Sequence, residues 1–308
     1  MNNTLQYIKQ AALSPQAFIA EAEQAYYNEI HTVAEIIARN DDIKIVSIAG
    51  PSASGKTTTA HILCEILQQM QEKTEVVSLD DFYLPQDHLP LLPDGRRDIE
   101  SVNALDKALI KRCLSEIIMT GKTDLPRFHF AERRHEPGAR TIDISQKGIV
   151  IVEGLHAINP VITEMVPKKN IYKLYISVNR PIRSEYESTV LSSRQIRLVR
   201  RILRDRVFRG TDVAETLHLW NGVVEGEIKH LYCFKPEADR HVKTLHLYEP
   251  CVYRDRFLPL VSGVTPDTPY YDYFMKTAEA LEKFPSLSEK DVPAHSLIRE
   301  FIGGGKYA

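Results

Sequence analysis

A short glycine-rich stretch has the composition of a phosphate cradle. Residues 50–57 are Gly-Pro-Ser-Ala-Ser-Gly-Lys-Thr, which matches the pattern G-x-x-x-x-G-K-[ST] without a mismatch. The glycines let the backbone curl so that its N–H groups face phosphate oxygens, and the positive end of a following helix adds to the attraction. We expect Lys56 to reach the β- and γ-phosphates of a nucleotide and Thr57 to place its hydroxyl on Mg²⁺. The predicted phosphate-binding residues are Gly50, Ser52, Ala53, Ser54, Gly55, Lys56, Thr57 and Thr58.

Two acidic residues follow apolar segments that have the pattern of buried strands. Asp80 comes after residues 75–79, and Glu153 comes after residues 149–152. Carboxylates at the carboxyl ends of parallel strands lie at the ligand-binding edge of a sheet. There Asp80 can deprotonate an attacking hydroxyl, and Thr57, Asp80 and Glu153 can arrange Mg²⁺. The alternatives are a turn cap for Asp80 and a solvated strand end for Glu153; the adjacent Asp81 is expected to point elsewhere.

The segment from Arg194 to Arg209 is strongly basic and has a helical pattern. Arg197, Arg201 and Arg204 are spaced i, i+4, i+7, which predicts one guanidinium-rich helical face. Such a face suits a lid that closes over a triphosphate and neutralises the charge that develops during transfer. A solvated helix or a nucleic-acid patch is the alternative.

The elements that would position these residues alternate between strand and helix. Strands are predicted over residues 43–49, 75–79, 149–152 and 171–178, and an extended segment over 124–130. Helices are predicted over residues 56–70, 102–120 and 193–208, with Gly121 as the end signal of the second. This order predicts an α/β fold: a doubly wound, mainly parallel sheet of five or more strands with flanking helices and an Arg-rich helical lid.

Composition excludes several classes of protein. The 308 residues include 39 Lys and Arg against 41 Asp and Glu, a net charge of −2, which argues against a protein that coats polyanions. The 4 cysteines include no C-x-x-C pair for zinc or redox chemistry. No apolar run approaches the ~18 residues of a membrane span, and the first residues lack the features of a signal or transit peptide. These observations predict a cytoplasmic protein that binds neither a membrane nor nucleic acid; a homo-oligomer stays possible.

The missing nucleotide motifs favour a small-molecule kinase. Neither the guanine-reading N-K-x-D motif nor the L-S-G-G-Q motif of transporter ATPases occurs in the sequence. An ATP-dependent enzyme that transfers the γ-phosphoryl group to a hydroxyl fits the residues that are present. The alternative from another class is an ATP-binding regulatory protein whose arginine-rich helix contacts RNA or a partner protein.

Taken together, these segments resemble the uridine kinase / phosphoribulokinase family of P-loop kinases. The matching residues are 50–57, 78–83, 126–130, 152–155 and 197–205, in the family's order. Residues 208–211, 216–220 and 296–303 resemble bacterial uridine kinase-like nucleoside kinases. The resemblance implies ATP and Mg²⁺ as cofactors and transfer to the 5′-hydroxyl of uridine or cytidine in pyrimidine salvage. It also implies that Asp80 is the general base. On the lid, it implies that Arg201, Arg204 and Arg209 contact the substrate and the phosphates. Beside the acceptor, it implies contacts from Tyr83, Glu100, Phe128 and Arg133.

The sequence departs from the family pattern where the acceptor is read. Phe128 stands where a Tyr is usual, and Glu100 replaces an Asp that holds the ribose. A base-reading His is missing near Arg133, a Gln becomes Leu219, and the lid sequence R-G-R becomes Arg-Gly-Thr at 209–211. A site without those hydrogen-bonding partners does not keep the same discrimination. The acceptor therefore stays open between a pyrimidine nucleoside and another hydroxyl compound, such as a sugar phosphate, pantothenate or glycerate.

The chain is predicted to contain one kinase domain with an extension. Residues 5–39 have a helical pattern, so residues 1–42 are predicted as a helical N-terminal extension and residues 43–308 as the kinase domain with a C-terminal helical tail. The three glycines at 303–305 lack the phosphate-loop spacing and predict a flexible end.

Overall fold

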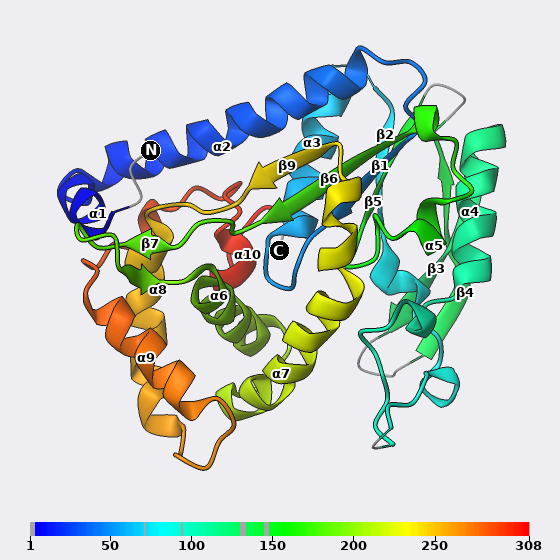
Figure 1. Cartoon of the computed structure of the whole chain (residues 1–308). Coiled ribbons are helices and arrows are strands. Elements are labelled where there is room, and N and C mark those ends of the chain that lie inside the picture. The colour runs from blue at the N-terminus through cyan, green and yellow to red at the C-terminus, as the bar shows by residue number, and fades with distance from the viewer. Residues whose placement is uncertain (1–3, 71, 94, 130–133, 145–147, 308) are drawn as a thin grey trace.

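Five parallel strands form the central sheet of the molecule (Figure 1). The computed structural model describes residues 4–70, 72–93, 95–129, 134–144 and 148–307. The strands lie in the order β2-β5-β1-β6-β9. Their bounds are Ile45–Ala49 (β1), Thr74–Ser78 (β2), Ile149–Glu153 (β5), Ile171–Ser177 (β6) and Arg240–Lys243 (β9).

The apolar strands are buried on both faces of the sheet. In β1, Ile45 and Ala49 contribute to one core and Val46 and Ile48 to the other. All residues of β1 and β5 are buried. Because both faces are covered, these strands are nearly continuous apolar runs and do not alternate between polar and apolar residues. Such runs can be recognised in the sequence.

Helices cover both faces of the sheet. One face and its extended core carry α2 (Pro15–Ala38), α3 (Lys56–Gln69), α6 (Ser193–Phe208), α7 (Val213–His230), α8 (Glu249–Phe257), α9 (Tyr271–Glu282) and α10 (Arg299–Ile302). The other face carries α4 (Lys107–Thr120) and α5 (Pro160–Thr163). In Figure 1, α8 and α9 lie at the left and α4 at the right. The predicted doubly wound α/β fold is therefore confirmed.

A β-hairpin beside the sheet was only half predicted. Strand β3 (Lys122–His129) pairs antiparallel with β4 (Arg134–Asp143), but the sequence indicated only the first of the two. Strand β4 is mostly exposed and polar, so it has no alternation of buried and exposed side chains to recognise. A second small hairpin joins β7 (Ile182–Arg183) and β8 (Thr189–Leu191).

Local caps set the ends of α4. The predicted start at residue 102 is a short 3₁₀ turn, and the helix begins at Lys107 because the Asp106 side chain accepts the Leu109 N–H at 2.9 Å. Its predicted end is confirmed, since Gly121 adopts the left-handed conformation with φ of 73°.

The first and last described segments pack against the rest of the chain. Helices α1 (Leu5–Ala11) and α2 share one hydrophobic core with the residues after position 42. The prediction of a flexible C-terminal end is wrong. Lys306 and Tyr307 both contact the carboxylate of Glu65, and the Tyr307 ring stacks on His61 with ring centres 5.8 Å apart.

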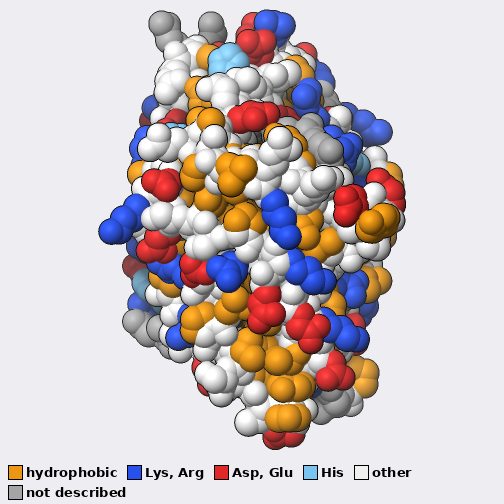
Figure 2. Space-filling model, turned by 90° about the vertical axis from the view of Figure 1, so that its left-hand side faces the viewer, with side chains coloured by type: hydrophobic (Ala, Val, Ile, Leu, Met, Phe, Trp, Pro, Cys, Tyr) orange, Lys and Arg blue, Asp and Glu red, His pale blue; other side chains and the backbone are white. Residues whose placement is uncertain are grey.

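The surface carries charges of both signs, as the near-neutral composition predicts, and the cysteines form no disulfide. On the face shown in Figure 2, positive and negative side chains are interspersed among hydrophobic ones. The four cysteines are free thiols, and Cys64, Cys113 and Cys251 are buried. Among the described residues, no helix combines the length and the apolar character needed to cross a membrane.

Candidate active site

The predicted phosphate loop is a tight turn between β1 and α3. Gly50 passes so close to β6 that an added Cβ would lie 2.3 Å from the Ile176 carbonyl oxygen. Gly55 adopts a φ of 89°, where a side chain would also collide with Leu297. Ala53 has a φ of 57°, a conformation that costs a non-glycine residue about 1–2 kcal/mol. The loop therefore holds a strained shape that the surrounding protein must support.

The loop ends at the positive end of α3. The Thr59 N–H donates to the Gly55 carbonyl at 3.0 Å, so the amides that precede it in the first turn have no intrahelical acceptor. Lys56 folds back over the loop, with Nζ donating to the Pro51 carbonyl at 3.3 Å. The Ser54 hydroxyl is buried without a partner in the described part of the chain. Free amides, a lysine and an orphaned hydroxyl around one turn fit the phosphates of a nucleotide.

A buried ion pair supports the loop at Ser52. Glu227 accepts the Ser52 N–H at 2.8 Å and two Arg197 N–H groups at 2.6 and 2.8 Å. Arg197 also donates to the Ser52 carbonyl at 3.0 Å. Arg197 therefore adds no free positive charge to the predicted guanidinium-rich face, because a carboxylate of α7 neutralises it inside the protein.

A second buried pair supports Ala53. Arg200 is fully buried, with Nε and Nη2 donating to Glu249 at 2.6 and 2.8 Å. Its Nη1 reaches the Ala53 carbonyl at 3.3 Å. Sequence reasoning missed Glu227 and Glu249, since neither directly follows a strand or belongs to a recognisable motif.

The remaining predicted lid arginines gather around one acid. Asp205 is buried and lies 3.3 Å from Arg201 Nε, 2.9 Å from Arg204 Nη2 and 3.5 Å from Arg209 Nη1. Arg201 Nη1 also donates to the Ser52 hydroxyl at 2.8 Å, which places this cluster beside the phosphate loop. Burial lowers the pKa of Arg201, and burial together with Arg204 lowers that of Arg209. Three guanidinium groups around one carboxylate leave an excess of positive charge that an anion would stabilise. The closing motion of a lid stays a prediction.

The two strand-end carboxylates lie at the same edge. The Ser78 hydroxyl donates to Glu153 at 2.6 Å and accepts the Asp80 N–H at 3.3 Å. The turn is thus capped by Ser78, which excludes the alternative of Asp80 as the cap. Asp80 is exposed, and its carboxylate has no hydrogen bond with any residue that the structure describes. Burial raises the pKa of Glu153 to about 7, and the negative charge of Asp80 adds to this.

The predicted acceptor residues lie next to this edge. The rings of Tyr83 and Phe128 have centres 5.8 Å apart at 56°. Burial raises the pKa of the Glu100 carboxyl to about 7, and Arg201 opposes the shift. Within the described residues, that carboxyl has no hydrogen-bond partner. Asp81 instead accepts the Phe128 N–H at 3.4 Å, so it points away as predicted.

Arg133 and His156 belong to the acceptor side of this edge by prediction and by position, respectively. Arg133 lies outside the described residues. His156, which the sequence did not single out, is buried three residues after Glu153. Its Nε2 lies 3.0 Å from the Glu100 carbonyl and therefore carries the proton, while Nδ1 has no partner among the described residues. Burial, with His230 nearby, lowers the pKa of His156 to about 4.

The donor set fits a magnesium ion that arrives with a nucleotide. Among the described residues, no group of three or more His, Cys, Asp or Glu side chains could hold a metal by itself. Mg²⁺ is usually held by one or two carboxylates, waters and the phosphates of the nucleotide. The exposed Thr57 hydroxyl and the carboxylates of Asp80 and Glu153 supply the matching oxygen atoms.

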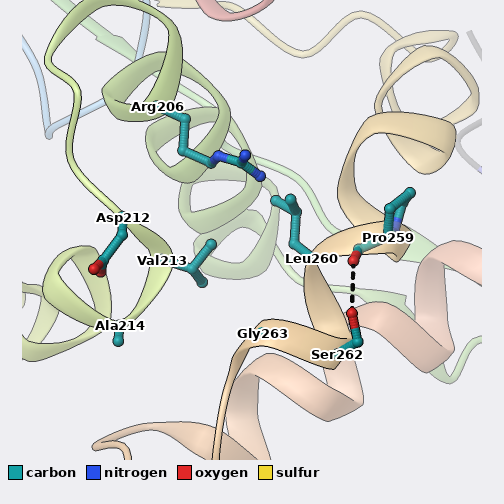
Figure 3. A pocket seen from close by; sticks show the side chains of 8 residues that line it. All are labelled: Arg206, Asp212, Val213, Ala214, Pro259, Leu260, Ser262 and Gly263. Carbon is teal, nitrogen blue, oxygen red and sulfur yellow. Dashed lines mark hydrogen bonds between the residues drawn. The ribbon is translucent and has the colours of Figure 1, made fainter.

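A separate cavity of about 340 Å³ lies between the end of α6, the start of α7 and residues 258–263 (Figure 3). Arg206 extends from α6 towards Leu260 across it. Asp212, on the other side, already caps α7 by accepting the Glu215 N–H at 2.7 Å. None of the described residues that line this cavity is a predicted site residue, so the cavity is not the candidate active site.

A comparison with known families decides the class. The model of the phosphoribulokinase / uridine kinase family matches residues 45–245. The chain belongs to this family. As such it is an ATP-dependent P-loop kinase, that is, a phosphotransferase.

Relatives of this kinase are identical to it at about a quarter of the aligned positions. A uridine kinase of Tolumonas auensis is 27% identical over 187 residues, 60% of this chain and 78% of that protein. A uridine kinase of Clostridium novyi is 25% identical over 181 residues, 59% of this chain and 77% of that protein.

Two solved structures are similar to this kinase. A putative fructose transport system kinase from Silicibacter has a TM-score of 0.48 at 18% identity and covers 66% of this chain and 95% of its own. Phosphoribulokinase from Rhodobacter spheroides has a TM-score of 0.45 at 14% identity and covers 66% and 71%.

Proposed function

We propose that this kinase transfers the γ-phosphoryl group of ATP to the 5′-hydroxyl of uridine or cytidine. The observation that carries the proposal is the Glu100 carboxylate, which has no hydrogen-bond partner among the described residues and lies near the Tyr83–Phe128 pair at the same edge as Asp80. A carboxylate accepts hydrogen bonds from the hydroxyls of a sugar, and aromatic rings offer a stacking surface to a base. Uridine kinases among the relatives support the same acceptor.

The charges at this edge favour an uncharged acceptor. Glu100 is within electrostatic reach of Asp80 and Glu227, and among the described residues Arg201 and Lys56 oppose their negative charge. Sugar phosphates, pantothenate and glycerate are all anions, so each would bring negative charge towards these carboxylates. A nucleoside is neutral and meets no such repulsion. Pyrimidine salvage in the cytoplasm is the proposed role.

In the proposed mechanism, each charged group has a separate task. Lys56 and the loop amides bind the β- and γ-phosphates. Asp80 accepts the proton of the acceptor hydroxyl. The oxygen of that hydroxyl bonds to the γ-phosphorus while the bond between the γ-phosphorus and the leaving ADP breaks. Arg201, Arg204 and Arg209 neutralise the charge on the transferring group. Thr57, Asp80 and Glu153 would hold Mg²⁺, which neutralises phosphate charge when bound.

The buried arginines argue against the regulatory alternative. A nucleic-acid surface needs exposed positive charge, whereas Arg197 and Arg200 are buried in ion pairs. Their contacts to the phosphate loop explain the basic segment as support for nucleotide binding.

An acceptor panel tests the proposal. ADP release is measured with uridine, cytidine, ribulose 5-phosphate, pantothenate and glycerate, and products are identified by mass. We expect turnover with the two nucleosides only, and none in a Lys56→Met control. Turnover with an anionic acceptor alone would overturn the nucleoside assignment. ATP binding without turnover on any acceptor, together with salt-sensitive RNA binding, would support the regulatory alternative instead.

A further inference from the structure

The last twelve residues described by the structure form a segment that crosses the phosphate loop. This C-terminal strap, residues 296–307, lies beyond the residues that the family model matches, and the proposed mechanism assigns it nothing. It contains α10, which packs beside α6, and it contacts α3 through Glu300.

The strap contacts the loop at the point where α3 begins. Thr58 Oγ1 donates to Glu300 Oε2 at 2.7 Å, and Thr58 is buried. The Leu297 side chain fills the space beside Gly55, since an added Cβ there would lie 2.5 Å from Leu297 Cδ1. Two residues of the strap therefore fix the turn whose amides face the phosphate site.

The strap also reaches the loop through Arg200. The Phe301 ring lies 4.9 Å from the Arg200 guanidinium carbon, which stands over its face. Arg200 in turn donates to the Ala53 carbonyl, the strained position of the loop. The same strap residue thus packs on the side chain that holds Ala53 in place.

Both ends of the strap are fastened to the core. Ser296 Oγ donates to Glu23 at 2.6 Å, and Tyr248 donates to the same carboxylate. At the other end, Lys306 Nζ and the Tyr307 hydroxyl each donate to Glu65 at 2.8 Å. With both ends fixed, the Glu300 carboxylate is held against Thr58 rather than left to move.

From this geometry we propose that the C-terminal strap is a wall of the nucleotide site and that Glu300 is a positioning residue for nucleotide binding. It acts by holding Thr58 and the first turn of α3 in the conformation that receives phosphate. The proposal rests on the nucleotide site of the proposed function. It does not depend on which acceptor is used.

Nucleotide binding without an acceptor tests the strap. The affinity for a fluorescent ADP analogue is measured by titration in the full chain. We expect Glu300→Ala to weaken binding about tenfold, since it removes a hydrogen bond to a charged group. Glu300→Gln keeps an acceptor for the Thr58 hydroxyl and should bind within about threefold of the wild type. Glu116→Ala removes a matching threonine–glutamate hydrogen bond, the one from Thr123 on the other side of the sheet, and should bind like the wild type.

A second pair of variants separates positioning from loss of the fold. Thr58→Val should weaken nucleotide binding as much as Glu300→Ala does. The double variant should bind no worse than either single variant, because each substitution removes the same Thr58–Glu300 hydrogen bond. Wild-type affinity in Glu300→Ala would overturn the proposal, as would equal losses in Glu300→Ala and Glu116→Ala. Failure of every nucleoside in the acceptor panel would leave these affinities unchanged, so the two proposals fail separately.

Discussion

Glu227 Oε1 accepts the N–H of Ser52 at 2.8 Å and the Arg197 guanidinium at 2.6 Å, so one buried carboxylate holds both the phosphate loop and its neighbouring arginine. Because Arg197 donates in turn to the Ser52 carbonyl, both polar groups of the Ser52 peptide backbone are fixed from outside the loop. The loop is thus shaped by α6 and α7 before any nucleotide binds.

Removal of Glu227 should cost both stability and nucleotide affinity. Glu227→Ala leaves the Arg197 charge buried without its partner, so we expect the free energy of unfolding to fall by about 3–5 kcal/mol. Urea denaturation measures this. The double variant Arg197→Met, Glu227→Leu removes both charges and should recover most of the stability, yet still bind nucleotide weakly because Ser52 has lost its support. Wild-type affinity in the double variant would contradict the supporting role.

Asp80 should matter for turnover and not for the fold. Its carboxylate is exposed and has no hydrogen bond among the described residues, so Asp80→Asn should change the melting temperature very little. Loss of a general base should lower kcat about 10²- to 10⁴-fold, with the affinity for nucleotide measured without Mg²⁺ kept. Asp81→Asn is the matched control and should stay within a few-fold, since Asp81 faces the Phe128 amide. Turnover close to wild type in Asp80→Asn would remove the base assignment.

The parts of the site that sequence predicted are those with local patterns. The phosphate loop, Asp80 and Glu153 each follow an apolar strand, so strand-then-site order was enough to place them at one edge. Glu227, Glu249 and Glu300 could not be found this way, because each meets a partner that lies far away in the chain and no spacing links the two. The predicted face of Arg197, Arg201 and Arg204 shows the same limit: helical spacing tells which side chains share a face, but not that a carboxylate lies opposite.

The elements of the fold that could be predicted are also those with a local sequence pattern. Strands buried on both faces were recognised by their apolar runs, whereas the exposed β4 had no such signal. The C-terminal glycines indicated flexibility, but Tyr307 and Lys306 beyond them bind Glu65, an interaction that composition does not encode.

Acceptor binding should depend on pH through Glu100. Burial raises the pKa of this carboxyl to about 7, so it is mostly protonated at pH 6 and mostly ionised at pH 8. If the ionised form receives the sugar hydroxyls, the acceptor KM should fall about tenfold from pH 6 to pH 8. Glu100→Gln should have a flat KM over this range, while changes caused by Glu153 would fall on kcat. A wild-type KM that does not change with pH would contradict this role of Glu100.

His156 should make the protein less stable in mild acid. Its folded-state pKa is lowered to about 4 from 6.5, with burial as the main cause and His230 as the second. The unfolded chain therefore binds a proton below about pH 6.5 while the folded protein does not, so stability is lost as pH falls through this window. We expect His156 to account for about 2 kcal/mol of the loss in unfolding free energy between pH 7.5 and pH 5. Urea titrations of wild type and His156→Asn at both pH values measure the contribution, because Glu100, Glu153 and His230 titrate in both proteins and cancel in the difference. Equal pH dependence in the two proteins would show that folding does not lower the pKa of His156.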